Sequence, residues 1–115
     1  MKVSYEGIGQ WAATFACTHA VEGEVVKISG NGTVSACSDG DSFCGMVLSA
    51  GRDGSACAVA LGGLVTAGYT GETAPAVGWS GLAADGSGGV KALSSGRSYL
   101  VVDVDESGKT VTFAL

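Results

Sequence analysis

The chain has 115 residues, which gives room for one domain with one hydrophobic core. Hydrophobic residues make up 46% of the chain and charged residues only 15%, a balance that excludes a disordered protein. The net charge is −5 and the six Lys and Arg residues are scattered, so we expect no nucleic-acid-binding surface, and the apolar runs are too short to cross a membrane.

Glycine sets the pattern of the chain. Its 20 glycines separate short runs of Val, Ile, Leu and Thr, which is typical of tight turns between strands. No window has the periodicity of a convincing amphipathic helix. We therefore predict an all-β fold, a compact small barrel or sandwich of eight or nine short strands paired as antiparallel hairpins. Residues 1–115 form a single domain in this interpretation, with residues 17–115 as its β core.

The first 16 residues are the least regular, and we interpret them as an irregular N-terminal arm or an edge strand. The first ten residues contain no apolar segment typical of a signal peptide. Tyr5, Trp11 and Phe15 are aromatic residues in this glycine-flanked segment, which makes them candidates for contact with a partner. The equal alternative is that the Trp11 and Phe15 rings cap the barrel or sandwich.

Two hairpins are predicted in the first half of the core. Asn31-Gly32 is a strong hairpin signal and places a turn within residues 23–36. Residues 43–67 contain three apolar runs separated by glycine-rich breaks. If residues 51–54 form the first loop, Leu48 faces Cys57 and Met46 faces Val59, which collects most bulky apolar residues on one side.

The second half begins with a loop at residues 68–75 that contains the only proline. A weak strand at 77–82, a turn at 84–89 and a returning strand at 90–93 follow. The final hairpin pairs Asp105 with Thr110, which predicts Val102 opposite Phe113 on a wholly apolar face. The other face then carries Tyr99 and Val101 towards solvent or a partner subunit.

The four cysteines do not form an obvious framework. In the predicted register Cys44 and Cys57 lie roughly 13 Å apart, too far for a disulfide, so we interpret both as small core residues. Cys17 and Cys37 remain open between free and paired states. Cys17 and His19 could form half of a zinc site with Cys37 and Cys44, but structural zinc sites usually contain closely spaced cysteine pairs, and the irregular spacing here disfavours a metal.

Several weak catalytic motifs have simpler explanations. Residues 7–12 match a dinucleotide-binding fingerprint, but a predicted hairpin follows where a helix is required. Ser80 with His19 is a remote hydrolase hypothesis, since nothing in the sequence connects the two. Residues 103–108 copy half of a calcium loop, and a hairpin tip explains their acids better. We therefore predict a protein that is not an enzyme and has no cofactor and no metal.

A family resemblance extends over most of the chain from residue 23 to residue 115. The segments that carry it are residues 24–27, 32–34, 39–45, 59–65, 69–71, 76–78, 82–91 and 99–105. Taken together, they resemble the capsid-decoration or capsid-cement proteins of tailed phages and prophages.

The resemblance implies a non-enzymatic β protein made in the bacterial cytoplasm and located on the capsid surface of a virion. Such a protein binds the major capsid protein from outside as a homotrimer and stabilises the head, with no small-molecule substrate. It implies capsid contacts by Tyr5, Trp11 and Phe15, with further loop contacts by Tyr69 and Trp79. The four cysteines are a departure from this family pattern, because binding to a capsid does not require them.

The alternative is a small ligand- or carbohydrate-binding β module. In that interpretation Tyr69 and Trp79 are stacking aromatic residues beside a loop rich in glycine and aspartate.

Overall fold

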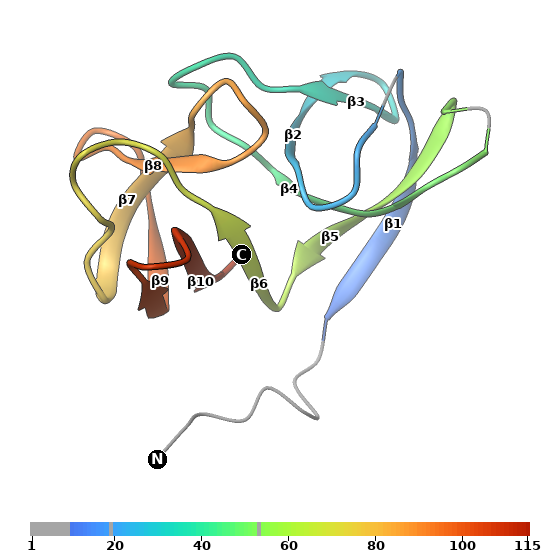
Figure 1. The fold of residues 1–115 in the computed structure, drawn as a ribbon. Coiled ribbons are helices and arrows are strands. Elements are labelled where there is room, and N and C mark those ends of the chain that lie inside the picture. The colour runs from blue at the N-terminus through green and yellow to red at the C-terminus, as the bar shows by residue number, and fades with distance from the viewer. Residues whose placement is uncertain (1–9, 19, 53) are drawn as a thin grey trace.

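The computed structural model describes residues 10–18, 20–52 and 54–115 (Figure 1). It confirms the all-β prediction, and the described residues contain ten strands where eight or nine were expected. The strands are β1 (Trp11–Ala16), β2 (Val25–Gly30), β3 (Thr33–Ala36), β4 (Gly45–Ala50), β5 (Ala56–Gly62), β6 (Leu64–Gly68), β7 (Gly78–Ala84), β8 (Val90–Ala92), β9 (Arg97–Asp105) and β10 (Thr110–Ala114).

Strands β1 to β5 form a closed barrel in the order β1-β3-β2-β4-β5, on the right of Figure 1. Strand β1 pairs antiparallel with β5 along its whole length and meets β3 in parallel at Ala16 and Thr33. Residues 1–16 were interpreted as an arm or an edge strand, and residues 1–9 lie outside the described residues. Residues 11–16 do form a strand, but β1 has a neighbour on both sides and is not an edge. The sequence did not indicate its place in the barrel, since β1 shows little two-residue alternation of apolar and polar side chains.

Strands β6 to β10 form a second sheet in the order β6-β10-β9-β7-β8, on the left of Figure 1. The chain beyond β6 crosses to the opposite edge of this sheet, where Tyr69 forms a parallel bridge with Val90. The backbone N–H of Thr70 donates to the Val90 carbonyl at 3.0 Å. The sheet therefore curls until the continuation of one edge strand meets the other edge.

Two apolar clusters fill the molecule. The smaller one combines Val26, Val34, Val47, Cys57 and Val59 of the barrel with Cys17. The larger one joins the second sheet to barrel strands through Val25, Met46 and Ala60. Neighbouring residues of β2, β4 and β5 therefore supply opposite clusters, because successive side chains of a strand point to opposite faces. This explains why these strands carry consecutive buried apolar residues.

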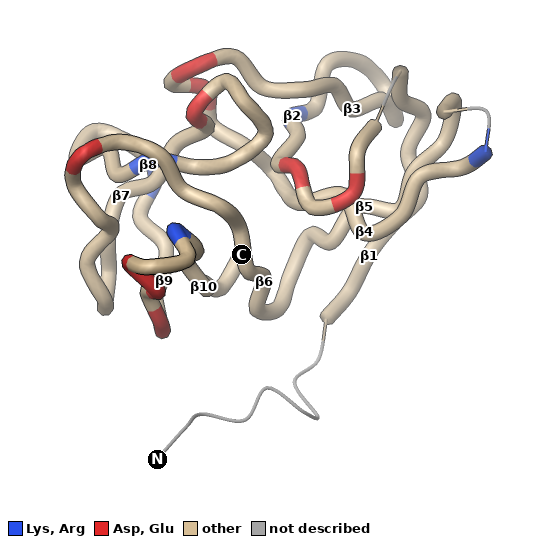
Figure 2. The backbone as a smooth tube through the Cα atoms, in the orientation of Figure 1, with Lys and Arg blue, Asp and Glu red and all other residues tan. Residues whose placement is uncertain are grey.

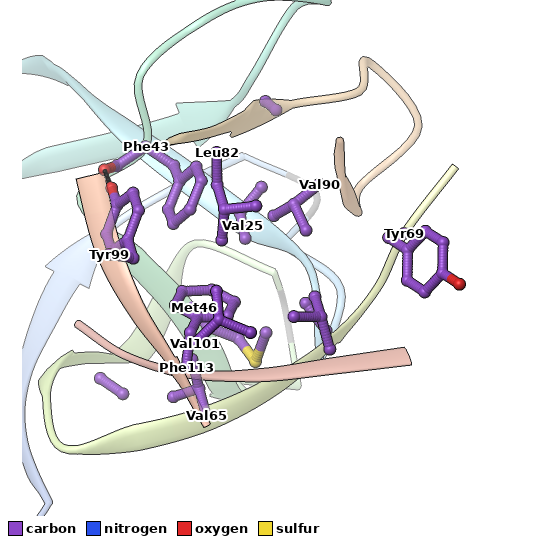
Figure 3. Close-up of a cluster of buried hydrophobic side chains, with 14 residues drawn as sticks. Val25, Phe43, Met46, Val65, Tyr69, Leu82, Val90, Tyr99, Val101 and Phe113 are labelled. Carbon is purple, nitrogen blue, oxygen red and sulfur yellow. Dashed lines mark hydrogen bonds between the residues drawn. The ribbon is translucent and has the colours of Figure 1, made fainter. Parts of the chain in front are cut away.

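Three aromatic rings lie at the centre of the larger cluster (Figure 3). Phe43 stacks on Tyr99 with ring centroids 5.0 Å apart, and Phe113 meets both rings edge to face. The Tyr99 hydroxyl donates to the Phe43 carbonyl at 3.2 Å, so the one polar atom of the group is satisfied. The Arg97 guanidinium lies 4.9 Å from the Tyr99 ring centroid and covers it at the edge of the core.

The register of β4 and β5 differs from the prediction. Ala50 pairs with Cys57 and Met46 with Ala60, whereas Leu48 had been placed opposite Cys57. The register shifts between Val47 and Ser49, and Leu48 between them is 39% exposed. Part of the difference arises at the loop, since a loop of residues 51–54 would place Ala50 opposite Ser55 and the observed partner is Cys57. The β-bulge then adds one residue to one strand, which reverses the faces beyond it and cannot be derived from a regular alternation.

The last hairpin contains the same kind of error. Asp105 pairs with Thr110 as predicted, but Phe113 pairs with Val101 where Val102 was expected. The register shift between Thr112 and Phe113 brings Tyr99 and Val101 to the inner face. Leu100, which the predicted alternation places on the same apolar face as Val102, is 36% exposed on the outer face.

The predicted turns of two hairpins are confirmed, since residues 31–32 connect β2 to β3 and residues 106–109 connect β9 to β10. In the turn after β7, one Asp85 carboxylate oxygen accepts from the backbone N–H groups of Ser87 and Gly89. The Gly88 carbonyl of this turn accepts from Val25 N–H at 2.9 Å, which fastens the second sheet to the barrel.

Candidate binding surfaces

The structure separates the predicted contact residues into exposed and covered ones. Trp11 and Trp79 are 62% and 75% exposed, while Tyr69 is 5% exposed. Phe15 is half-buried and packs against the smaller cluster. Tyr5 lies outside the described residues. Trp11 belongs to the barrel and Trp79 to the second sheet, so the chain has two distinct aromatic surfaces.

The Trp11 side chain lies directly on a glycine of the neighbouring strand. Trp11 pairs with Gly62, and a Cβ atom at residue 62 would overlap the indole ring. Gln10 holds the chain beside this position, with its side-chain amide donating to the Leu64 carbonyl at 3.3 Å. The indole is therefore seated on backbone while most of its surface remains in solvent. An ordered exposed tryptophan loses little conformational freedom when it binds.

Phe15 and Tyr69 offer much less surface. Phe15 is paired with Cys57 across β1 and β5 and packs on the interior of the barrel, in agreement with the alternative in which this ring caps the barrel. Tyr69 lies in the larger cluster and its ring is covered by the Lys109 ammonium, 5.3 Å from the ring centroid. Contact roles for these two residues stay predictions, and their burial argues against a large share in binding.

Trp79 lies on the outer face of the second sheet, opposite Leu100 of β9. Beside it is a shallow groove of about 610 Å³. The groove is lined by Thr73, Ala74, Ala76, Trp79, Ser80, Gly81, Ala92, Leu93, Ser94 and Ser98. Among the lining residues the sequence drew attention only to Trp79 and, for a different reason, to Ser80, because the other segments of the lining are brought together only by the fold.

The charged residues that the structure describes lie mainly in loops, where acidic residues predominate (Figure 2). Two ion pairs connect Lys27 with Asp41 at 2.6 Å and Lys91 with Asp39 at 2.7 Å. The hydrogen bond from Lys27, supported by the backbone N–H of Ser38, lowers the pKa of the Asp41 carboxyl. No charged residue occurs in β1 or β7, the strands that carry the two exposed tryptophans.

All four cysteines are free thiols, which decides the question left open for Cys17 and Cys37. Cys57 is buried, as predicted, and Cys44 packs against the smaller cluster. Burial, with the neighbouring Cys17 thiol as a further cause, raises the pKa of Cys57 to about 11. Burial also raises the pKa of Cys37 to about 11, with the Asp41 charge adding to it. Within the described part of the chain, no group of three or more His, Cys, Asp or Glu residues could hold a metal ion.

These thiols predict an alkaline limit to stability. Their folded pKa values exceed the usual 9.0, so the folded state keeps protons that the unfolded chain releases. The stabilisation is complete below about pH 9 and is lost as the pH rises through about 11. Urea unfolding between these values should show the free energy of unfolding falling with pH. Cys37→Ala should flatten that slope, and an unchanged slope in this variant would contradict the assignment to Cys37.

Only one of the two residues of the remote hydrolase hypothesis can be placed. Ser80 pairs with Tyr99 within the second sheet, and His19 lies outside the described residues, so the hypothesis stays a prediction. At the tip of the last hairpin, Asp105 accepts hydrogen bonds from the backbone N–H groups of Ser107 and Gly108. The Asp105 carboxylate therefore stabilises the turn, in agreement with the interpretation of residues 103–108 as a hairpin tip.

The fold and these surfaces describe an all-β protein with two separate exposed tryptophans. Comparison with protein-family models and with curated proteins found no match. Among the described residues, no helix is long and apolar enough to cross a membrane.

Proposed function

We propose that this protein binds the outer surface of a phage or prophage capsid and stabilises the head. The partner in this proposal is the major capsid protein, and the binding unit is a homotrimer located on the virion surface. The protein acts by adhesion and is not an enzyme. Many copies of a modest interface, repeated over a shell, give a large combined stabilisation without a strong single contact.

The exposed indole of Trp11 is the observation that carries the proposal. Tryptophan is enriched among the residues that dominate protein–protein binding energy, especially where the ring is held in place before binding. Trp11 meets both conditions, since it is 62% exposed and seated on Gly62. The family resemblance of residues 23–115 supplies the kind of partner, and the uncharged β1 strand suits a contact that excludes water.

The proposal predicts that Trp11→Ala weakens binding to heads by about 30-fold, the loss expected for a binding hot spot of about 2 kcal/mol. The assay is co-sedimentation with empty heads assembled from the major capsid protein of the phage or prophage that encodes the chain. A substitution is preferable to deletion of β1, because β1 closes the barrel. Light scattering on the free protein and the variant checks that the oligomeric mass is unchanged.

Ile28→Ala is the matched control, since Ile28 is a barrel residue that is 52% exposed and should bind heads like the parent protein. Parent protein that fails to bind heads would reject the proposed function. Head binding that persists unchanged in Trp11→Ala would reject Trp11 as the anchor.

A further inference from the structure

The groove beside Trp79 has the size and the composition of a ligand site. Its volume of about 610 Å³ lies within the usual range for small-molecule pockets. Its walls come from the loop before β7, from β7, from the end of β8 with the segment after it, and from the start of β9. Gly81 allows the close approach of two of these walls. Its carbonyl accepts from Leu93 N–H at 3.0 Å, and a Cβ atom at residue 81 would overlap the Leu93 carbonyl oxygen.

Trp79 supplies a flat apolar surface at one side of this groove. It is the most exposed of the large hydrophobic residues described, at 75%, and its cross-strand partner Leu100 is 36% exposed. An indole face carries partial negative charge, so it attracts the weakly positive C–H groups of a ring laid flat upon it.

The rest of the lining is divided between small apolar residues and hydroxyl-bearing residues, and none of it is charged. Thr73, Ser80, Ser94 and Ser98 each carry a group that can both donate and accept, and within the described chain none of these hydroxyls has a side-chain hydrogen bond. Thr73, Ser94 and Ser98 are exposed. The lining contains neither an acidic nor a basic residue, which disfavours an ionic ligand and leaves uncharged polar groups to be recognised.

We propose that this groove binds a neutral glycan, with the C–H face of one pyranose ring stacked on Trp79 and the sugar hydroxyls bonded to Thr73, Ser94 and Ser98. A sugar ring is the ligand class that presents a flat apolar face and a rim of paired donors and acceptors together. Tyr69, which the sequence suggested as a second stacking residue, has no part in this site because it is buried. The site is separate from Trp11, so it does not depend on binding to heads.

The test uses the whole chain with Trp11→Phe, which leaves Trp79 as the sole tryptophan of the sequence. The probes are neutral oligosaccharides of glucose, mannose, galactose and N-acetylglucosamine, titrated to about 10 mM because stacking with a few hydrogen bonds gives millimolar affinity or better. We expect a saturable change of Trp79 fluorescence with at least one neutral probe. Added salt should leave the affinity unchanged, since no charge lines the groove.

Calorimetry with the same probe should show about tenfold weaker binding for Trp79→Ala and a smaller loss for Ser98→Ala, while Ile28→Ala on the barrel binds normally. Heparin oligosaccharides, as charged probes, should bind at least about tenfold more weakly than the neutral ones. Absence of saturable binding for every neutral probe would overturn the proposal. Binding that survives Trp79→Ala, or that falls steeply with salt, would overturn it equally. Because heads are absent from this assay, its failure is distinct from a failure of capsid binding.

Discussion

Phe113→Ala is expected to destabilise the protein by about 3–5 kcal/mol, the range for removal of a fully buried phenylalanine. Phe113 is 0% exposed and lies in the cluster that joins the second sheet to the barrel. Its ring contacts Phe43 and Tyr99 at centroid distances of 5.8 and 5.2 Å. The cavity left by alanine would therefore remove edge-to-face contacts as well as buried apolar area. Urea unfolding followed by circular dichroism measures the loss.

Leu100→Ala is the control for this experiment. Leu100 belongs to the neighbouring strand β9 but faces outward at 36% exposure, so we expect a cost of less than about 1 kcal/mol. The pair also tests the register, because a regular hairpin would bury Leu100. A large loss for Leu100→Ala with a small one for Phe113→Ala would contradict the inward face described for β9 and β10.

The fold class and the turns could be predicted from local chemistry. Glycine at positions such as Gly32 and Gly86 takes positive φ, which other residues rarely adopt, so these turns leave a direct signal in the sequence. Buried β strands likewise leave runs of Val, Ile and Leu. These signals were sufficient for the all-β prediction and for the tips of the hairpins.

The register beyond a bulge could not be predicted. Leu48 and Val102 each lie where the pairing shifts by one residue, and nothing in their local sequence distinguishes them from the valines beside them. Strand β1 was misjudged for a related reason. Backbone pairing with β5 holds β1 in the barrel, and its short alanine side chains leave little alternation of apolar and polar residues in the sequence.

The aromatic residues of the candidate surfaces could be named from the sequence, but their surroundings could not. They could be singled out as aromatic residues in glycine-rich segments, whereas their exposure depends on tertiary contacts. Tyr69 and Trp79 looked equivalent in sequence, and the parallel bridge to Val90 buries the first while β7 presents the second outward. The hydroxyl groups around Trp79 come from segments as far apart as residues 73 and 98, so no motif could have joined them.

Gly45→Ala should be strongly destabilising, although it adds only one methyl group. Gly45 is buried where β4 passes between β2 and β5, and it pairs with Val26. A Cβ atom here would overlap the Ala60 carbonyl oxygen and lie 2.8 Å from Val59 Cγ1. The obstacle is mainly backbone of a paired strand, which cannot turn aside as a flexible side chain can. We expect a loss of about 3 kcal/mol, at the upper end of the cost of overpacking.

Gly30→Ala is the matched control, because it makes the same chemical change in a strand of the same barrel. Its φ is not positive, and the nearest atom to an added Cβ is Thr33 Cβ at 3.8 Å, an ordinary contact. A glycine-to-alanine change that the native backbone can accommodate reduces the entropy of the unfolded chain. The free energy of unfolding of Gly30→Ala should therefore differ from that of the parent protein by less than about 1 kcal/mol. Equal urea midpoints for the two variants would mean that β4 and β5 can separate without cost. The close approach of Gly45 to Ala60 would then not be the reason for a glycine at position 45.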